Sequence, residues 1–413
     1  MGTSGVGRRR HSRPNRLGPI RHLLCSTILV ANHDRNSMSA RWNRTLAEYI
    51  SVPPREPPRF SATWASVGLD LLRGLAAILV LVDHWRNLFF VNFHSVVAHR
   101  WFFAVPYVLT AAGHQAVVIF FVLSGFLIGG TVRHAFDQGR WSWASYLTHR
   151  LVRLWVVLIP GLMLCLLWDK LGGSADTGTA IAFIGNMFFL QGVLVPAFGS
   201  DGPLWSLANE FWYYVLFPLG LVAVLPSTRP RARLVTAALF LLLCLWLRTT
   251  LLPLFPIWLL GAIVLIVPRP RLGSTLRWLA VAAYVPIVYL CSYAQTIFSV
   301  AADCILAAAT AMLIWALMSA SQAAPAASKR VRFSRGLARF SYTLYVVHFP
   351  LLTLIAGLLI GKERWLPTFL HIATALGVLA VTLAYAYGIA LLTEFHTGAV
   401  RNWVERRLGL AEG

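Results

Sequence analysis

The sequence predicts an all-α, polytopic membrane protein with about ten transmembrane helices and one re-entrant or interfacial segment. Composition is the first observation: of 413 residues, 58% are hydrophobic and only 12% are charged, whereas soluble proteins carry about 25% charged residues. Second, the apolar residues come in runs of about 20, the length that a helix needs to cross a bilayer. These observations exclude a soluble enzyme, a disordered tail protein and a secreted disulfide scaffold.

The distribution of charge is the third observation. The formal net charge is +21, and the basic residues cluster in short loops between apolar runs, as in the cytoplasmic loops of membrane proteins. Most of this charge is therefore an orientation signal, and no nucleic-acid partner is expected. The 5 cysteines show no CxxC spacing, so neither a metal site nor a disulfide framework is predicted.

Residues 1–60 form a separate compositional zone, which we expect to be a disordered cytoplasmic extension. The zone is rich in arginine and poor in acidic residues, and four prolines lie near its end. Its apolar stretch 23–31 is similar to a signal-peptide core, but cleavage there would leave the basic flank of the next helix outside, against the charge rule. Because Met38 is an alternative start, the sequence leaves open whether residues 1–37 belong to the mature protein.

Ten apolar spans are expected within residues 61–396, the predicted transmembrane domain, and a short cytoplasmic tail follows over 397–413. The expected spans are 67–91, 104–130, 149–168, 204–225, 233–252, 254–268, 278–293, 298–320, 341–361 and 367–392. Both termini are expected in the cytoplasm, with the protein in the cell inner (plasma) membrane.

An eleventh apolar stretch, 179–196, is not expected to cross. If the basic clusters at 133–150 and 229–233 both face the cytoplasm, an even number of crossings must separate them. Counting 179–196 as a span gives three crossings, whereas a re-entrant segment leaves two. The stretch also contains polar residues, and polar or non-helical backbone at membrane depth is tolerated only where it lines a cavity. We therefore expect residues 179–203 to dip back at the outer side.

Four ionisable residues interrupt the first span: Asp70, Arg73, Asp83 and His84. Each costs at least ~2.5 kcal/mol on insertion scales. At about 100° and 1.5 Å per residue, Arg73 and His84 share one helix face about 16 Å apart, and Asp70 lies within about 40° of it. Snorkelling near the helix end explains Arg73, but not His84, which follows ten mostly apolar residues. His84 is therefore a candidate functional residue.

Three further groups of polar residues lie in or beside spans. Arg150 and Arg153, with Tyr146 one turn earlier, form a pair suited to phosphate, although ordinary positive-inside anchoring also explains them. Glu210 lies among aromatic residues at the start of a span, where a desolvated carboxylate needs a compensating partner. His348 lies within a later span, either as a functional group or as a satisfied packing residue.

The second expected span has two further features. Ser124 and Gly125 interrupt an aromatic run, and we interpret them as a close helix-packing point, because small residues let two helices approach closely. His114 either lines the same cavity as His84 or packs elsewhere.

Taken together, these segments resemble the acyltransferase 3 family of membrane-bound O-acyltransferases. The resemblance runs from Gly68 to Glu394. The segments that carry it are 69–77 with His84, 120–128, Tyr146 with Arg150 and Arg153, 204–214, and 341–350. It implies transfer of an acyl group, most simply acetyl, from acyl-CoA as co-substrate, without a permanently bound cofactor. The implied acceptor is a hydroxyl of a carbohydrate, glycan, lipid or polyketide-type molecule.

The resemblance also implies roles for individual residues. The family's Arg-x10-His motif falls on Arg73 and His84, and the basic pair associated with the CoA phosphates falls on Arg150 and Arg153. The family often closes with a Glu followed closely by Pro, whereas no Pro follows Glu394 here, which leaves its role in doubt. Some members carry a C-terminal hydrolase domain, and none is expected in this chain.

Our mechanistic hypothesis makes His84 the general base that deprotonates the acceptor hydroxyl. Arg73 would stabilise the oxyanion or hold the CoA pantetheine and phosphate region, with Asp70 orienting it. Glu210 and His348 would complete the polar cavity. The alternative function is a transporter or flippase of a (glyco)lipid that uses the same residues as a proton relay. A structural scaffold would not explain the ionisable stripe.

Overall fold

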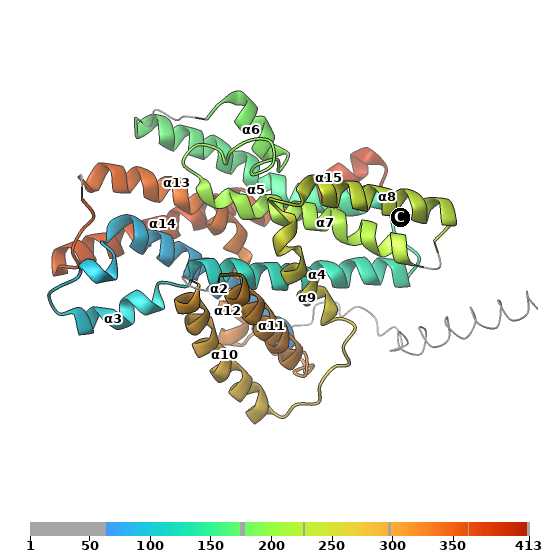
Figure 1. Ribbon diagram of the computed structural model, residues 1–413, viewed down its shortest axis with the longest axis horizontal. Coiled ribbons are helices and arrows are strands. Elements are labelled where there is room, and N and C mark those ends of the chain that lie inside the picture. The colour runs from blue at the N-terminus through green and yellow to red at the C-terminus, as the bar shows by residue number, and fades with distance from the viewer. Residues whose placement is uncertain (1–62, 174–177, 226–227, 296–298, 362, 411–413) are drawn as a thin grey trace, which may run out of the picture. The chain divides into compact units, whose positions relative to one another are not determined.

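The structure, a computed structural model, describes residues 63–173, 178–225, 228–295, 299–361 and 363–410 (Figure 1). The expected extension over residues 1–60, with the signal-like stretch and Met38, lies outside the described residues. The described residues contain helices and three isolated bridges but no strand. The predicted all-α class is confirmed.

Nine helical stretches in the described part of the chain are long and apolar enough to cross a membrane. Their helices are α2 (Trp64–Phe89), α4 (Gly113–Asp137) preceded by α3 (Arg100–Leu109), α5 (Trp143–Leu171), α7 (Trp205–Val224), α8 (Pro230–Leu247), α10 (Ser274–Ala294), α11 (Ser299–Leu317), α13 (Ser341–Leu359) and α14 (Phe369–Leu392). The shorter helices include α6 (Ala180–Met187), α9 (Phe255–Ile263), α12 (Lys329–Arg339) and α15 (Thr397–Leu408). A polytopic membrane protein is thus confirmed.

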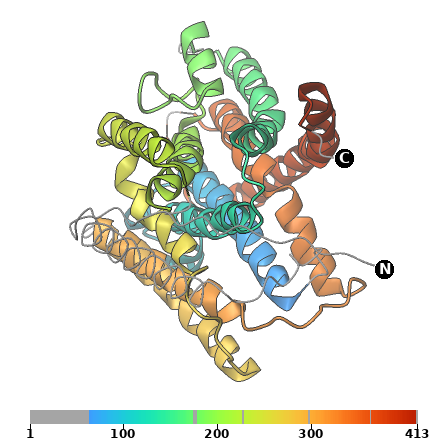
Figure 2. The same cartoon turned by 90° about the vertical axis from the view of Figure 1, so that its right-hand side faces the viewer.

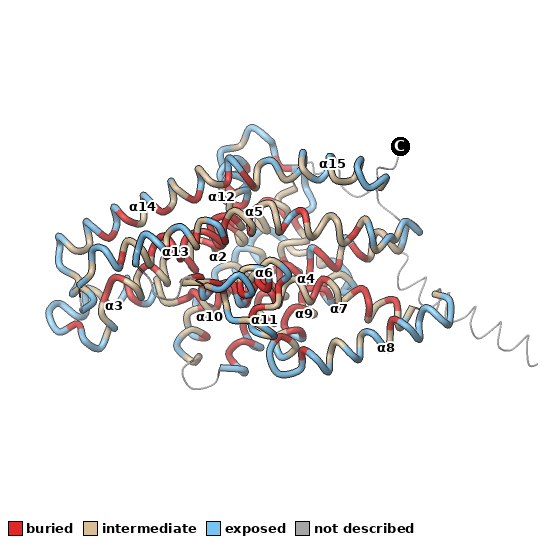
Figure 3. The backbone as a smooth tube through the Cα atoms, turned by 90° about the horizontal axis from the view of Figure 1, so that it is seen from above, coloured by how far each residue is buried: buried red, intermediate tan, exposed pale blue. Residues whose placement is uncertain are grey.

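Helix α4 lies near the middle of these helices, as Figure 2 shows. Most of its residues are buried, whereas α8 buries only Thr236 and Leu247. Figure 3 shows the same contrast, with exposed residues concentrated on outer elements such as α3, α8 and α15. In a membrane protein the apolar residues exposed on the outer faces of spans contact lipid, so their exposure is expected.

Of the ten expected spans, 254–268 is the one that differs. Only α9 and the turn before it are helical there, and nine residues of α-helix extend about 14 Å, less than the ~30 Å hydrocarbon core. Prolines explain the short length: Pro256 lies in its first turn and Pro268 follows its end. Helix α9 therefore does not cross alone, and it packs instead against the centre of α4.

Two glycines allow α4 and α9 to touch through their backbones. A Cβ atom at Gly125 would lie 1.9 Å from the carbonyl oxygen of Trp258, and one at Gly261 would lie 1.9 Å from the carbonyl oxygen of Val122. Neither position tolerates a side chain without separating the helices. The sequence prediction of a close helix contact at Ser124 and Gly125 is confirmed.

The stretch 179–196 does not form a crossing helix, as predicted. Helix α6 has 8 residues, about 12 Å, and irregular backbone followed by one 3-10 turn, Gly202–Leu204, leads from it to α7. The side chain of Asn186 holds this segment together: its Nδ2 donates to the carbonyl oxygens of Ala182 (2.8 Å) and Pro196 (2.9 Å), and its Oδ1 accepts from the amide of Phe198 (3.2 Å). Asn186, one of the polar residues that argued against a crossing helix here, thus provides hydrogen-bond partners for the irregular backbone.

Helices α2 and α13 run side by side in the same direction. Near the start of α2, Arg73 contacts Ala338, which lies just before α13, and farther along α2, His84 contacts His348 two turns into α13. The end of α2 is fixed to the segment after α13, since the amide of Trp365 donates to the carbonyl oxygen of Phe89 (2.8 Å). The polar face predicted for α2 therefore faces α13.

Candidate active site

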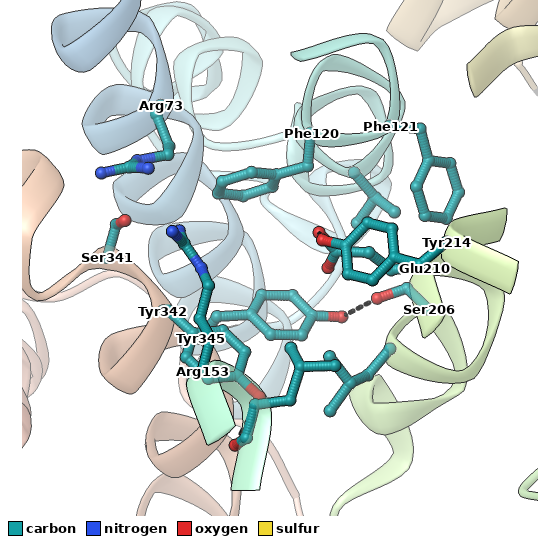
Figure 4. Close-up of a pocket in the computed structure, with 13 residues that line it drawn as sticks. Arg73, Phe120, Phe121, Arg153, Ser206, Glu210, Tyr214, Ser341, Tyr342 and Tyr345 are labelled. Carbon is teal, nitrogen blue, oxygen red and sulfur yellow. Dashed lines mark hydrogen bonds between the residues drawn. The ribbon is translucent and has the colours of Figure 1, made fainter. Parts of the chain in front are cut away.

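A cavity of about 80 Å³ lies between α2, α4, α5, α7 and α13 (Figure 4). It is lined by Arg73, Val117, Phe120, Phe121, Arg153, Leu154, Ser206, Leu207, Glu210, Tyr214, Ser341, Tyr342 and Tyr345. One water needs roughly 10–15 Å³ on a comparable scale. The cavity therefore has room for a group of a few heavy atoms but not for a long chain.

One wall of the cavity is cationic. Figure 4 shows Arg73 and Arg153 directed toward the side of the cavity where Ser341 lies. Nη2 of Arg73 donates to the carbonyl oxygen of Ala338 at 3.0 Å, while its buried Nε has no hydrogen-bond partner in the described part of the chain. Asp70 lies within electrostatic range of Arg73 but does not line the cavity. A backbone carbonyl, not Asp70, therefore provides the hydrogen bond that orients Arg73.

The opposite wall carries Glu210 inside a network of hydroxyl groups. Its Oε1 accepts hydrogen bonds from Ser124 Oγ (3.1 Å) and from the hydroxyl of Tyr214. Nε1 of Trp258, on α9, donates to Ser124 Oγ at 3.2 Å. Ser124 thus does more than permit close packing, because it links the carboxylate to the short helix.

The two arginines predicted as a pair on α5 have different surroundings. Arg153 lines the cavity, whereas the guanidinium carbon of Arg150 lies 5.6 Å from the ring centroid of Tyr146, and its Nε has no partner among the described residues. The hydroxyl of Tyr146 donates to the carbonyl oxygen of Tyr214 at 3.0 Å. Tyr146 therefore positions Arg150 beside the cavity but not in its lining.

The two candidate histidines meet outside the cavity. Nδ1 of His84 and Nε2 of His348 are 2.9 Å apart, and their rings are nearly parallel at 8°. Nδ1 of His348 lies 2.9 Å from the carbonyl oxygens of both Leu344 and Tyr345. His348 is buried, with 1% of its surface exposed.

These contacts assign the hydrogens of the neutral pair. Carbonyl oxygens only accept, so Nδ1 of His348 carries a hydrogen and its Nε2 is the acceptor. Nδ1 of His84 then donates to His348, and Nε2 of His84 keeps its lone pair. This nitrogen can accept a proton from a substrate. The sequence placed both histidines as candidates but gave no sign that they form a pair.

Tyr345 lies between the cavity and the histidine pair. Its hydroxyl donates to the carbonyl oxygen of Pro203 (2.6 Å) and lies 2.5 Å from Ser206 Oγ. Its ring meets Phe120 edge-on at a centroid distance of 6.2 Å and lies 6.3 Å from the ring of His348. Glu210 and His348 therefore do not share one cavity, as the sequence hypothesis had them, but lie on two sides of this wall.

Glu394 is a site residue whose role the sequence left in doubt. Its Oε2 accepts from the backbone amide (2.9 Å) and hydroxyl (2.8 Å) of Thr343 in the first turn of α13. A carboxylate at a helix N-terminus is favourable, so Glu394 stabilises the helix that carries His348. Its charge also acts on Arg73 and Arg153. A Pro after it is not needed for this contact.

His114 does not join His84. Its Nε2 lies 2.9 Å from Oδ1 of Asp303 on α11, and Asp83 pairs instead with Arg86 at 2.9 Å. Both ion pairs lie apart from the cavity lining.

Sequence reasoning missed one further acidic residue, Asp201, which is buried in the segment before α7. Asp201 has 1% of its surface exposed, and neither of its carboxylate oxygens has a hydrogen-bond partner in the part of the chain that the structure describes. Burial raises the pKa of the Asp201 carboxyl well above its usual range, and the neighbouring carboxylate of Asp169 raises it further. Asp201 lies in the segment 179–203 that was expected to dip into the membrane, but the sequence analysis did not single out its carboxyl.

Apolar spans around a histidine pair and a basic cavity define an integral membrane protein with polar groups buried between its helices. Comparison with known proteins then specifies the family. The acyltransferase-domain profile of the acyltransferase 3 family matches residues 66–390, and the chain belongs to this family.

Two curated relatives are similar to parts of the chain. The "Putative peptidoglycan O-acetyltransferase YrhL" of Bacillus subtilis (strain 168) is 29% identical over 190 residues, which are 43% of this chain and 27% of the relative. An uncharacterised protein of Haemophilus influenzae is 32% identical over 119 residues, 25% of this chain and 47% of that protein. The chain thus spans less than half the length of either relative. No solved structure matches.

Proposed function

We propose that the protein is a membrane O-acyltransferase that moves a short acyl group, acetyl in the simplest case, from acyl-CoA to a glycan hydroxyl. The observation that carries this proposal is the His84–His348 pair, which leaves one imidazole nitrogen free to accept a proton. Family membership and the name of the Bacillus relative support acyl transfer and a cell-wall glycan as the acceptor class. A lipid or small-molecule hydroxyl remains an alternative acceptor.

In the proposed reaction, Nε2 of His84 takes the proton from the acceptor hydroxyl as its oxygen attacks the thioester carbonyl. The new C–O bond forms, the C–S bond breaks, and the thiolate of CoA leaves and takes up the proton from the imidazolium. His348 holds His84 in the reactive tautomer through the hydrogen bond at Nδ1. Atoms and charge balance without a further reactant.

The cavity is proposed to bind the donor. Arg73 and Arg153 supply positive charge that attracts the anionic donor to the cavity, and Arg150 adds charge beside them. Arg73 and His84 are eleven residues apart on one helix, about 16 Å by helical rise. This separation favours donor binding by Arg73 over stabilisation of an oxyanion at His84. The acyl end would then lie against Phe120 and Tyr345, on the side of the cavity nearest the histidine pair, and the Tyr345 side chain must move aside for the thioester carbonyl to reach His84.

The location proposed with this function is the bacterial inner membrane, with the basic loops and both ends of the transmembrane domain in the cytoplasm. Successive spans place all the basic loops on the cytoplasmic side, provided that α9 and the residues after it together bring the chain back to that side. The donor cavity, which Arg73 and Arg153 line near the start of α2 and α5, would then open toward cytoplasmic acyl-CoA.

The test is acyl transfer by the purified protein in lipid nanodiscs, with radiolabelled acetyl-CoA and muropeptide oligomers. We expect release of CoA thiol together with label in ester linkage. His84→Ala should lower kcat by about 100- to 10,000-fold, the usual contribution of general acid–base catalysis. The matched control is His114→Ala, which removes a histidine that pairs with Asp303 instead, and it should keep most activity.

Two results would contradict the proposal. Full activity of the His84→Ala variant in a properly inserted protein would exclude the base. Absence of both CoA release and acyl-protein from the wild type, with movement of a labelled glycolipid between leaflets, would favour a transporter.

A further inference from the structure

Helix α12 carries a stripe of three arginines, Arg332, Arg335 and Arg339, which we call the α12 stripe. The spacings of three and four residues place them within about 60° of one another on the helix. All three are exposed, while the face of α12 next to the stripe is buried through Val331, Ser334 and Ala338. The helix contains no acidic residue.

The α12 stripe ends at the cationic wall of the cavity. The carbonyl oxygen of Ala338, next to Arg339, accepts the hydrogen bond from Arg73, and Ser341, two residues after Arg339, lines the cavity. Seven residues of helix separate Arg332 from Arg339, a rise of about 10 Å. Positive charge therefore continues from the cavity along the surface of α12.

This charge has no carboxylate within salt-bridge distance among the described residues, because none of the observed ion pairs includes an arginine of the stripe. Arg339 packs over the ring of Phe395, 3.8 Å from its centroid, and Arg335 acts on Asp70 only at longer range. Gly336 lies between the arginines, and nothing lies within 4 Å of where its Cβ would be. The surface is thus open and cationic.

We propose that the α12 stripe binds the phosphorylated nucleotide end of the acyl-CoA donor, while the thioester end of the same molecule enters the cavity. This inference rests on the proposed function. Guanidinium groups bind phosphate through paired, charge-assisted hydrogen bonds, and CoA carries its phosphates at the end remote from the thioester. Continuity with the cavity favours CoA over the phosphate of a lipid headgroup.

The test compares three acetyl donors: acetyl-CoA, 3′-dephospho-acetyl-CoA and S-acetylpantetheine, which lacks the nucleotide. The full chain is used in nanodiscs of zwitterionic lipid. For the double variant Arg332→Gln/Arg335→Gln we expect KM for acetyl-CoA to rise about tenfold or more, with kcat unchanged. KM for S-acetylpantetheine should not change, and dephospho-acetyl-CoA should show an intermediate effect.

The matched control is Arg269→Gln/Arg271→Gln, which removes the same charge from the exposed loop between α9 and α10. That loop contributes nothing to the cavity lining, so the control should leave all three KM values unchanged. An equal rise in KM for every donor, or none for acetyl-CoA, would overturn the proposal. Restoration of the double variant by anionic lipid would assign the stripe to lipid headgroups instead.

Calorimetric titration with CoA and with pantetheine separates this inference from the proposed function. Wild-type protein that binds CoA more tightly than pantetheine but transfers no acetyl group would contradict the proposed function and leave the nucleotide site standing. Equal weak binding of the two molecules would exclude the site.

Discussion

The cavity and the histidine pair both lie along α2 and α13, yet they differ in what their polar groups contact. In the cavity, Nε of Arg73 has no hydrogen-bond partner among the described residues, and Arg153 is exposed. In the pair, each contact of His348 is satisfied by a neighbouring nitrogen or carbonyl oxygen, and the side chain is enclosed. The cavity thus has capacity left for a charged ligand, whereas the pair is preorganised for one proton transfer.

The largest effect is expected for substitution of His348, which tests whether the histidine pair acts in proton transfer. His348→Leu removes the acceptor for Nδ1–H of His84, so we expect kcat to fall about 100-fold while KM for acetyl-CoA stays unchanged. His348→Gln retains an oxygen that can accept this hydrogen bond and should recover part of the loss. Steady-state kinetics of both variants test this. A rise in KM with unchanged kcat would instead place His348 in donor binding.

Substitution of Arg153 tests whether the cavity binds the acyl-CoA donor. Arg153→Gln removes one of the two positive charges in the lining, so KM for acetyl-CoA should rise about tenfold and kcat should change little. Arg140→Gln removes an exposed charge outside the lining and should leave KM unchanged. The idea fails if Arg153→Gln lowers kcat as strongly as His348→Leu does.

Phe120 tests whether the wall between the two regions limits the acyl group. Phe120→Ala enlarges the cavity on the side of Tyr345. The ratio of kcat/KM for butyryl-CoA to that for acetyl-CoA should rise about tenfold, as expected for one or two methylenes in an apolar site. Phe211→Ala, at an aromatic residue stacked on Phe189 outside the lining, should not change this ratio.

Two parts of the fold could be predicted from the sequence. Which residues share a helix face depends only on nearby residues, and the number of crossings between basic loops follows from counting apolar spans. The spacing of Arg73 and His84 placed both on one face, and the parity of basic loops showed that 179–196 does not cross. The short length of α9 also has a local cause in its prolines, which hydropathy alone does not weigh.

The remaining features depend on tertiary contacts. His348 meets His84 only because α13 runs parallel to α2 in the right register, and no pattern in one sequence states that register. In the same way, Arg150 and Arg153 look equivalent at i and i+3, but their neighbours separate them, since only Arg153 reaches the cavity.

The smallest expected effect concerns Asp201, which neither region uses. Burial raises the pKa of its carboxyl in the folded protein, so the folded state prefers the protonated form. Stability from this group is full below the unfolded pKa of about 3.9 and is lost as the pH rises toward the folded value. Asp201→Asn does not titrate, so its stability relative to wild type should increase between pH 4 and pH 7, by on the order of 1–3 kcal/mol.

Thermal unfolding in detergent at these two pH values measures the difference, with acetyl transfer as the parallel readout. Activity should stay near the wild-type level because Asp201 does not line the donor cavity. A variant that is more destabilised at pH 7 than at pH 4 would show that the carboxyl is ionised and paired in the folded protein. A specific loss of kcat would extend the reactive region beyond the histidine pair to the buried acidic residues.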